Sequence, residues 1–465
     1  MMEQDGSAAR DYHEATKHQP GETTQRRLID VELIPQQYKR YVGLPSMQLP
    51  EPGDPDGPLT LSSLSSLLHY SAGIIRRRQI DGRELEFRAA SCTGALYHVE
   101  LYLVCGSIND LRAGVYHYDA TAETLHSLRE GDYRSVVAAA TGIGDPGPEA
   151  FIVLTSTFWR NAWRYEERAY RHAFWDSGTI GANMIGLAEA RRLTPHLHVG
   201  FIDAAINHLL GVDSNREAAT CIVALGSDTA YAPAPAVETT SHPTEPLSKV
   251  EIEYPLIWQT HSATSLNHVP ALDRWLDSAP TTPPGDITGP SSRELQDVIS
   301  RRGSTRHFKD EPMTRPELAN LLEAAASPMR ADFPSLTQAF VIVNNVEGLP
   351  NGTYRSNVQD QRLQRLQRGD FHARAAHLAL DQPSAGEAAV NIYFVAQLNE
   401  VLEDLGERGY RAAQLEAGIR GGRVYLEATR LGLRASGLTF YDDEVVKLFE
   451  EPESTAVLFL IVVGR

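Results

Sequence analysis

The chain has 465 residues, 42% of them hydrophobic, which is enough to build the cores of two or three domains. Its formal net charge of −17 argues against nucleic acid or an anionic membrane as a partner. Three cysteines without a Cys-x-x-Cys pair exclude a disulfide framework, and the longest apolar stretch, residues 456–463, is too short to span a bilayer. The acidic N-terminus lacks the apolar run of a signal peptide, so the sequence predicts a cytoplasmic protein.

Residues 1–58 are polar and contain prolines, which is typical of an arm that wraps a core or of a disordered segment. Leucines at helical spacing predict a helix within 59–75, and a loop of small residues follows at 88–97. The next elements are predicted as strands at 99–104, 114–118 and 151–155, helices at 136–140 and 166–193, and closing segments at 199–203 and 220–225. This alternation predicts an α+β sandwich over residues 59–226.

Residues 227–292 are rich in Pro, Ser and Thr and are predicted to be a linker with one ordered patch at 253–258. A second domain is predicted from 293 to 465. It contains a helix at 318–326 and a buried strand at 456–463.

The second domain repeats the first. The pair Tyr170-Arg171, followed by Asp176, Gly178 and Gly181, recurs 240 positions later (410 − 170) as Tyr410-Arg411, followed by Glu416, Gly418 and Gly421. A second block, from Thr60 through Leu64 to Leu68, recurs 254 positions later (314 − 60), from Thr314 through Leu318 to Leu322. Matches at constant offset predict two copies of one fold in tandem.

The segment Arg302-Gly-Ser-Thr-Arg-His-Phe308 concentrates two arginines and a serine hydroxyl behind a predicted helix. Guanidinium groups bind phosphate oxygens in bidentate fashion, although a solvated basic helix end has the same composition. The corresponding stretch of the first copy, residues 48–54, has no arginine and two acidic residues, so it is not expected to bind phosphate. The second copy in turn has Phe333 where the first copy has the small-residue loop Ser91-Cys-Thr-Gly94. Each copy is therefore expected to keep one half of a site.

These motifs together resemble the SagB/McbC-type azoline dehydrogenases of the FMN-dependent nitroreductase superfamily. The motifs that carry the resemblance are Tyr12-His-Glu-Ala-Thr-Lys-His18, Leu67-Leu-His-Tyr-Ser-Ala-Gly-Ile74, Ser91-Cys-Thr-Gly-Ala-Leu-Tyr97 and Trp163-Arg-Tyr-Glu-Glu-Arg-Ala-Tyr-Arg171, besides the 302–308 segment. The resemblance implies two tandem nitroreductase-like α/β sandwich domains that form an intramolecular pseudo-dimer with one FMN site. It implies oxidation of thiazolines or oxazolines to thiazoles or oxazoles in a ribosomally made precursor peptide, in partnership with a cyclodehydratase complex.

The resemblance also implies roles for individual residues. It assigns FMN binding to Arg302, Ser304, Arg306, Ser91, Cys92, Thr93, Gly94, Gly437, Leu438 and Arg465. The family places a Lys-Tyr pair where this chain has Arg164-Tyr165, so Tyr165 is the expected base and Arg164 the cation that lowers its pKa. An arginine does not itself lose a proton, which removes any proton-shuttle role of the family lysine. A tyrosine that only packs an interface is the competing interpretation.

Three functions stay open from the sequence. They are an azoline oxidase, a general NAD(P)H-dependent nitro or quinone reductase, and a non-catalytic scaffold of a peptide-modifying complex. No metal site is predicted, because His196 and His198 lack further ligands at suitable spacing. Cys92 is expected to offer its backbone amide, with a reactive thiol as the minor alternative.

Overall fold

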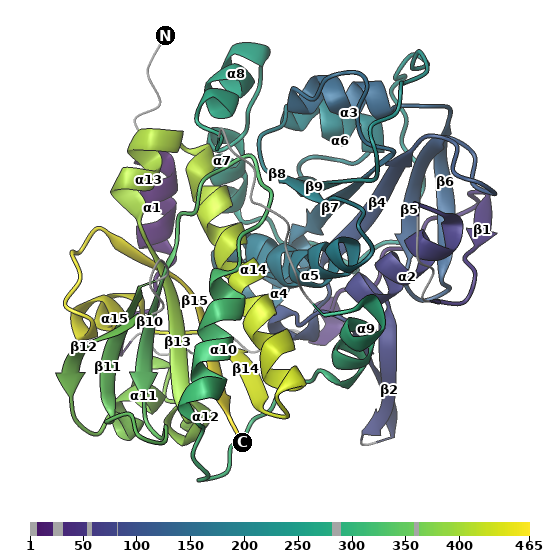
Figure 1. Cartoon of the computed structure of the whole chain (residues 1–465). Coiled ribbons are helices and arrows are strands. Elements are labelled where there is room, and N and C mark those ends of the chain that lie inside the picture. Colours follow the sequence, from purple (N-terminus) through teal and green to yellow (C-terminus); the bar gives the residue numbers. More distant parts are fainter. Residues whose placement is uncertain (1–6, 22–30, 54–57, 81, 281–289, 358–361) are drawn as a thin grey trace. The chain divides into compact units, whose positions relative to one another are not determined.

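The computed structural model describes residues 7–21, 31–53, 58–80, 82–280, 290–357 and 362–465 (Figure 1). The chain divides into two compact units. We call residues 30–300 with 328–334 the N-terminal domain, and residues 1–29, 301–327 and 335–465 the C-terminal domain. Among the described helices, none combines the length and apolarity that a bilayer crossing requires.

The described residues of the N-terminal domain form a seven-stranded antiparallel sheet in the order β1-β6-β5-β4-β7-β9-β8. Its strands are β1 (Ser46–Gln48), β4 (Val99–Cys105), β5 (Gly114–Asp119), β6 (Thr124–Glu130), β7 (Ala150–Thr157), β8 (His196–His198) and β9 (Glu217–Leu225). A separate hairpin joins β2 (Ile74–Ile80) to β3 (Arg83–Arg88). The central strands β4, β7 and β9 are buried along their whole length, so they supply the core of this domain.

The helices of the N-terminal domain include one long buried helix. They are α2 (Leu61–Ala72), α3 (Arg134–Thr141), α4 (Phe158–Tyr165), α5 (Ala169–Ala190), α6 (Asp203–Leu210), α7 (Pro255–Ala263), α8 (Val269–Asp277) and α9 (Ser292–Arg301). Short 3-10 turns occur at η1 (Val31–Leu33), η2 (Thr93–Ala95) and η3 (Glu166–Arg168). Nearly every residue of α5 is buried, which explains its small side chains, such as Gly178 and Gly181.

The C-terminal domain has a six-stranded sheet among its described residues, in the order β12-β11-β10-β13-β15-β14 (Figure 1). The strands are β10 (Gln338–Val343), β11 (Gly352–Asn357), β12 (Arg362–Arg368), β13 (Val390–Gln397), β14 (Arg434–Leu438) and β15 (Thr455–Gly464). The helices are α1 (Ser7–Ala15), α10 (Arg315–Ala326), α11 (His372–Leu378), α12 (Pro383–Glu387), α13 (Leu398–Leu405), α14 (Arg408–Arg430) and α15 (Asp442–Leu448). The long helix α14 packs against α10 and against β15.

The tandem repeat is confirmed by the topology. Leaving β1 aside, the two sheets have the same strand order, and β7 and α4 recur as β13 and α13 at the predicted offset of 240. Thr60 and Thr314, 254 positions apart, both cap the following helix through a reciprocal capping box. Asp176 and Glu416 both accept a hydrogen bond from the backbone of the loop before the first central strand.

The structure adds detail to three segments of the sequence interpretation. The helix predicted at 166–193 is the 3-10 turn η3 followed by α5, because Glu166 has a positive φ of 51° that interrupts the helix. The closing segment predicted at 199–203 connects the end of β8 to the start of α6. The predicted linker contains two helices, α7 and α8, and both begin with a proline in the first turn.

Two segments belong to the domain that is distant from them in sequence. Helix α1 is part of the C-terminal domain, where the Glu407 carboxylate accepts hydrogen bonds from the backbone N–H groups of Ala8 and Ala9 at 3.0 and 2.7 Å. These N–H groups have no partner within the helix, so Glu407 caps α1. Residues 328–334 belong to the N-terminal domain, where Ala331 forms an isolated bridge with Leu197 of β8.

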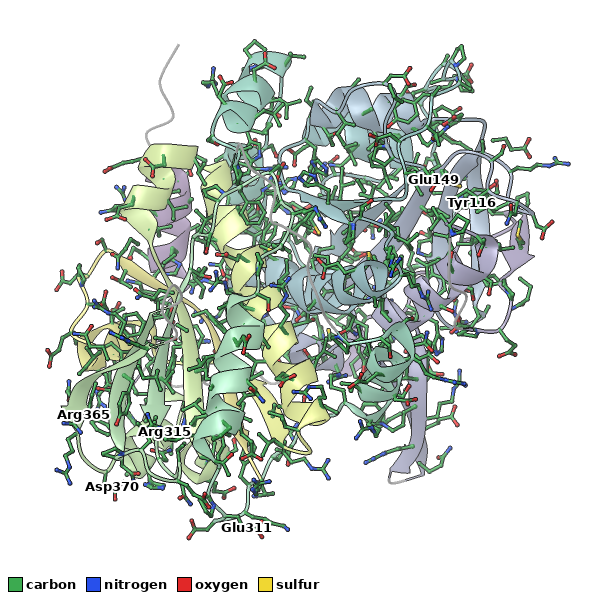
Figure 2. The ribbon with its side chains drawn as sticks, in the orientation of Figure 1. Tyr116, Glu149, Glu311, Arg315, Arg365 and Asp370 are labelled. Carbon is green, nitrogen blue, oxygen red and sulfur yellow. The ribbon has the colours of Figure 1, made fainter. Side chains whose placement is uncertain are left out.

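The edge strand β12 carries exposed arginines at 362, 365 and 368. Figure 2 shows Arg365 at the periphery of the C-terminal domain. Charged side chains on an edge strand oppose pairing with another chain, so we attribute a protective role to this edge.

Candidate functional site

The small-residue loop of the N-terminal domain is attached to α5 by hydrogen bonds from two side chains, those of Asp176 and Thr179. Asp176 Oδ1 accepts hydrogen bonds from the Thr93 backbone N–H at 3.0 Å and from the Thr93 hydroxyl at 2.9 Å. The Thr179 hydroxyl donates to the Ser91 carbonyl at 2.7 Å. The loop that begins at Ser91 is thus positioned by two side chains of α5, and a small pocket beside it is lined by Ser91, Cys92, Arg88, Tyr97, Asp176 and Ile180, among others.

Gly94 and Tyr165, both predicted as site residues, lie against each other. Gly94 has a φ of 63°, and a Cβ at this position would lie 2.7 Å from the Tyr165 hydroxyl. A side chain larger than hydrogen at Gly94 would therefore displace the tyrosine. The structure brings together a hydroxyl and a loop that are 71 positions apart in sequence (165 − 94).

The Tyr165 side chain is half-buried at the end of α4. Its ring stands edge-on to His172, with 4.7 Å between the ring centroids, and the His172 ring hydrogen-bonds to Asn161 at 2.8 Å between Nδ1 and Oδ1. The exposed Arg164 places its Cζ 5.6 Å from the centroid of the Tyr165 ring, within the range of a cation–π contact. The predicted pair of hydroxyl and neighbouring cation is therefore present as a local arrangement.

Cys92 is poorly suited to act as a nucleophile. Burial, together with the nearby Asp176 carboxylate, raises the pKa of its thiol well above the usual value of 9.0. Its Sγ lies 3.1 Å from Asp176 Oδ2. Because the thiolate is the reactive form, these surroundings disfavour the reactive-thiol alternative.

In the C-terminal domain, the predicted phosphate-binding segment runs beside β14. Arg302 is buried, with its Cζ 5.6 Å from the centroid of the Tyr425 ring. The Tyr425 hydroxyl is 3.0 Å from the Ser304 hydroxyl and accepts a hydrogen bond from the backbone N–H of Gly437. Tyr425 thus links two predicted cofactor-binding positions, and sequence reasoning did not identify it.

The remaining predicted residues of this domain differ in their surroundings. Arg306 and Ser304 are exposed, and Leu438 ends β14 in a partly buried position. Arg465 donates from Nη2 to both carboxylate oxygens of Glu317, at 2.8 and 2.9 Å, and from Nε to the Pro312 carbonyl at 3.1 Å. These hydrogen bonds occupy the guanidinium of Arg465, which the sequence predicts as a phosphate ligand, so Arg465 has to exchange Glu317 for phosphate to fulfil the prediction.

Two segments, residues 48–54 and the loop that contains Phe333, are predicted not to contact the cofactor. Residues 48–53 begin at the end of β1, and Asp54 lies outside the described residues. Phe333 is 3% exposed. The neighbouring Asp332 carboxylate accepts hydrogen bonds from the backbone N–H groups of Val199 and Gly200 and from Trp275 Nε1.

A buried ion network in the N-terminal domain includes none of the predicted site residues. Lys39 Nζ lies 2.7 Å from Glu217 Oε2 and 2.8 Å from the Tyr102 hydroxyl. The Tyr102 and Thr155 hydroxyls both donate to Glu217 Oε1 at 2.7 Å. Burial alone raises the pKa of Glu217, but Lys39 lowers it overall. This network fastens the irregular segment around Lys39 to strands β4, β7 and β9.

Strand β8 carries two neighbouring histidines, His196 and His198. Within the described structure, three of their four ring nitrogens have no hydrogen-bond partner. The rings of His196 and His198 stack at 4.4 Å, and within the described structure neither ring nitrogen of the buried His198 finds a partner. Burial lowers the pKa of His198 to about 4, and burial together with His198 lowers the pKa of His196 to about 4. The nearest carboxylate, Asp332, lies 3.8 Å from His198 Nδ1.

This pair predicts an acid-sensitive region in the N-terminal domain. The pKa of His198 is lower in the folded protein than its value of 6.5 in the unfolded chain, so protonation favours unfolding. The free energy of unfolding is therefore highest above pH 6.5, and it decreases as the pH falls from 6.5 to 4. For His198 the difference corresponds to about 3 kcal/mol. We expect His198→Phe to flatten this pH dependence and the exposed His208→Gln to leave it unchanged, in urea unfolding at several pH values. An unaltered slope in His198→Phe would contradict the assignment.

The comparisons with known proteins agree with this architecture. Residues 299–465 match the model of the Nitroreductase family. A candidate nitroreductase of Methanocaldococcus jannaschii is 28% identical over 184 residues, which are 37% of this chain and 91% of that protein. A crystal structure of a candidate nitroreductase from Anabaena variabilis has a TM-score of 0.83 at 27% identity and covers 98% of this chain and 99% of that one. The structure of the E. coli microcin synthetase McbBCD complex with truncated pro-MccB17 bound is 20% identical, over 36% of this chain and 69% of that one. Its TM-score of 0.32 is too low to establish structural similarity.

Proposed function

We propose that this chain, in which residues 299–465 form a nitroreductase-family domain, is an FMN-dependent oxidoreductase that oxidises thiazoline or oxazoline rings in a peptide. The observation that carries the proposal is the contact between Tyr165 and Gly94. It puts a titratable hydroxyl against the loop to which the sequence motifs assign flavin contacts. A general base beside the flavin is what azoline oxidation requires.

The residues present fit the chemistry of FMN. Arg302, Arg306 and the Ser304 hydroxyl are a donor set suited to a phosphate dianion. The loop from Ser91 to Gly94 and the backbone at Gly437 and Leu438 supply small side chains and N–H groups of the kind that permit close approach to a ring system. When bound, FMN supplies the acceptor for a hydride.

Tyr165 has the role of the base. Aromatising an azoline breaks two C–H bonds: one ring carbon releases a proton and its neighbour releases a hydride with its electron pair. The tyrosinate oxygen of Tyr165 takes the proton, and the guanidinium of Arg164, 5.6 Å from the ring, stabilises the tyrosinate by its positive charge. The net change in the substrate is the loss of two hydrogens and the gain of one double bond.

The partners follow from the substrate. An azoline in a peptide arises when a cyclodehydratase condenses a cysteine, serine or threonine side chain with the preceding amide, so the proposal includes association with such an enzyme and its precursor peptide in the cytoplasm. The negative net charge of the chain favours a substrate peptide that is neutral or basic.

A second candidate function is a general nitro or quinone reductase driven by NAD(P)H. It is favoured by the full-length similarity to the A. variabilis protein, which is described as a candidate nitroreductase. The half-buried Tyr165 argues for the first candidate, because reduction of a nitro group or quinone does not require proton abstraction from a ring carbon.

The experiment that separates them is mass spectrometry of an azoline-containing peptide after incubation with the purified protein in air. Loss of two hydrogens per ring supports azoline oxidation. An intact azoline together with rapid consumption of NADPH in the presence of a nitroarene or quinone would establish the second candidate. A protein that is colourless and does not take up FMN would contradict both and favour the scaffold.

Replacement of Arg302 or Arg306 by alanine is expected to release most of the FMN while the fold survives. Each charge-assisted hydrogen bond contributes about 1.5–3 kcal/mol, so one lost contact weakens binding by about tenfold or more. Flavin fluorescence titration measures the dissociation constant, and circular dichroism checks the fold. The exposed neighbour Arg301, changed to alanine, is the matched control. Equal retention in all three variants would show that Arg302 and Arg306 do not bind the phosphate of FMN.

A further inference from the structure

Three potential metal ligands converge where the small-residue loop, β4 and α5 meet. They are Cys92 of the loop, His98 just before β4, and Asp176 of α5. Asp176 Oδ2 lies 2.7 Å from His98 Nε2 and 3.1 Å from Cys92 Sγ. His98 is fully buried and Asp176 is 4% exposed. Their ligand atoms all lie within 4.8 Å of one another, and no other such group occurs among the described residues.

Each of these side chains is oriented by a further partner. The backbone N–H of Tyr97 donates to Cys92 Sγ at 3.1 Å, as it would to a thiolate. His98 Nδ1 lies 2.9 Å from the Ser156 hydroxyl, which leaves Nε2 to face the cluster. The Thr93 hydroxyl donates to the other oxygen of Asp176, Oδ1, and the Thr93 backbone N–H lies 3.0 Å from both oxygens, so the carboxylate is held in place. Outer partners of this kind fix the tautomer and orientation of metal ligands in known sites.

We propose that Cys92, His98 and Asp176 bind one divalent transition metal ion, with Zn²⁺ as the preferred ion. A thiolate, an imidazole and a carboxylate are the ligand types of zinc sites. Ligand atoms around tetrahedral Zn²⁺ lie about 3.3–3.6 Å apart, given bonds of about 2.0–2.3 Å. Asp176 Oδ2, at 2.7 Å from His98 Nε2 and 3.1 Å from Cys92 Sγ, therefore has to move away from each by only about half an ångström.

The surroundings suit a site with three protein ligands. Cys92 and Asp176 line the small pocket beside the loop, which leaves room for a water molecule as the fourth ligand. Cys92 and Asp176 together carry two negative charges, which neutralise the ion. The guanidinium of Arg88, which also lines this pocket, already donates to the carbonyls of Ala72 and Val99. A bound ion would tie the loop, the strand and the helix together at one point.

Binding is expected to release a proton. The Cys92 thiol donates to Asp176 Oδ2 at 3.1 Å, so it carries a proton in this arrangement, whereas a metal ligand has to be the thiolate. In weakly buffered solution, the flavin-loaded wild-type protein should therefore acidify the medium by about one proton per Zn²⁺ bound.

The test is a titration of the purified wild-type protein with Co²⁺ and Zn²⁺, with elemental analysis after dialysis. We expect one metal ion per chain and, in the Co²⁺ difference spectrum, a thiolate-to-cobalt charge-transfer band. Cys92→Ser should abolish the band and weaken binding by about tenfold or more, whereas Cys221→Ser, at a buried cysteine outside the cluster, should change neither. A band that persists in Cys92→Ser, or a wild-type protein that binds no metal, overturns the proposal and leaves a hydrogen-bonded cluster.

A second measurement needs no variant. Zn²⁺ should slow the alkylation of Cys92 in the wild-type chain while leaving the alkylation of Cys105 and Cys221 unchanged, as followed by peptide mapping. Equal rates for Cys92 with and without Zn²⁺ would contradict the site even if every Cys92 variant failed to fold.

Discussion

If the proposed function holds, we expect Tyr165→Phe to slow azoline oxidation by about 10²–10⁴-fold, the usual contribution of a general base, while the protein keeps its flavin. The hydroxyl that is removed is the group that lies against Gly94, and the aromatic packing on His172 is retained. Single-turnover reduction of the flavin by an azoline peptide measures the step directly. Reoxidation by O₂ should be little changed, because it needs no proton from the substrate. Full turnover in Tyr165→Phe would assign the tyrosine to packing alone.

Variants of Arg164 refine this result. Arg164→Lys restores the pair that the family carries and should be tolerated, whereas Arg164→Ala should slow the reaction and shift its pH profile upward, because it removes the cation near the tyrosinate. Tyr116→Phe is the matched control. Tyr116 lies on β5, away from the loop, and its hydroxyl donates to the Arg112 carbonyl at 2.8 Å (Figure 2).

Lys39→Met destabilises the N-terminal domain by about 3–5 kcal/mol, because it leaves the buried Glu217 carboxylate without its cation. Hydrogen exchange of peptides from β7 and β9 under native conditions measures the loss in this domain separately from the rest of the chain. The charge of Glu217 is the cause of the effect, so Lys39→Met combined with Glu217→Gln should recover a large part of it.

The control for this prediction is an exposed ion pair of the same type. Lys249 lies 3.5 Å from Glu32, and both side chains are more than 70% exposed. Surface pairs contribute little, so Lys249→Met should give no measurable change. If Lys39→Met were as mild as Lys249→Met, the Lys39 network would not fasten its segment to the sheet.

The repeat explains why so much of the fold was predictable. Capping threonines, leucines at helical spacing and apolar strands are local signals, and they occur twice at constant offset, so each copy supports the interpretation of the other. The misses have local causes as well. The positive φ of Glu166 breaks a pattern that looks continuous, and helices α7 and α8 begin at prolines within a segment whose composition is typical of a linker.

The sequence motifs identified residues of the candidate site, but they did not predict which of those residues contact each other. Tyr165 and the 91–94 loop were singled out from motifs, but nothing in the sequence indicates that the hydroxyl lies against Gly94. The role of Asp176 as the clamp of the loop, and that of Tyr425 between Ser304 and Gly437, depend on residues that are 83 and 121 positions apart. Such pairings come from tertiary structure, which local patterns do not encode.

Each domain contains a segment that is distant from the rest of it in sequence: residues 1–29 belong to the C-terminal domain and residues 328–334 to the N-terminal domain. A fragment cut at the family boundary, residues 299–465, would lack α1, so the Glu407 carboxylate would lose the two N–H groups that it caps and Tyr410 would lose its edge-on contact with Tyr12. The same cut would leave 328–334 on the wrong fragment, away from the backbone that Asp332 binds. Ribosomal synthesis makes α1 almost 400 residues before its partner Glu407, so the helix cannot dock on Glu407 until that residue has been synthesised. Neither domain is therefore complete when the chain reaches residue 300, and we expect that two fragments split near this point would fold only when they are co-expressed.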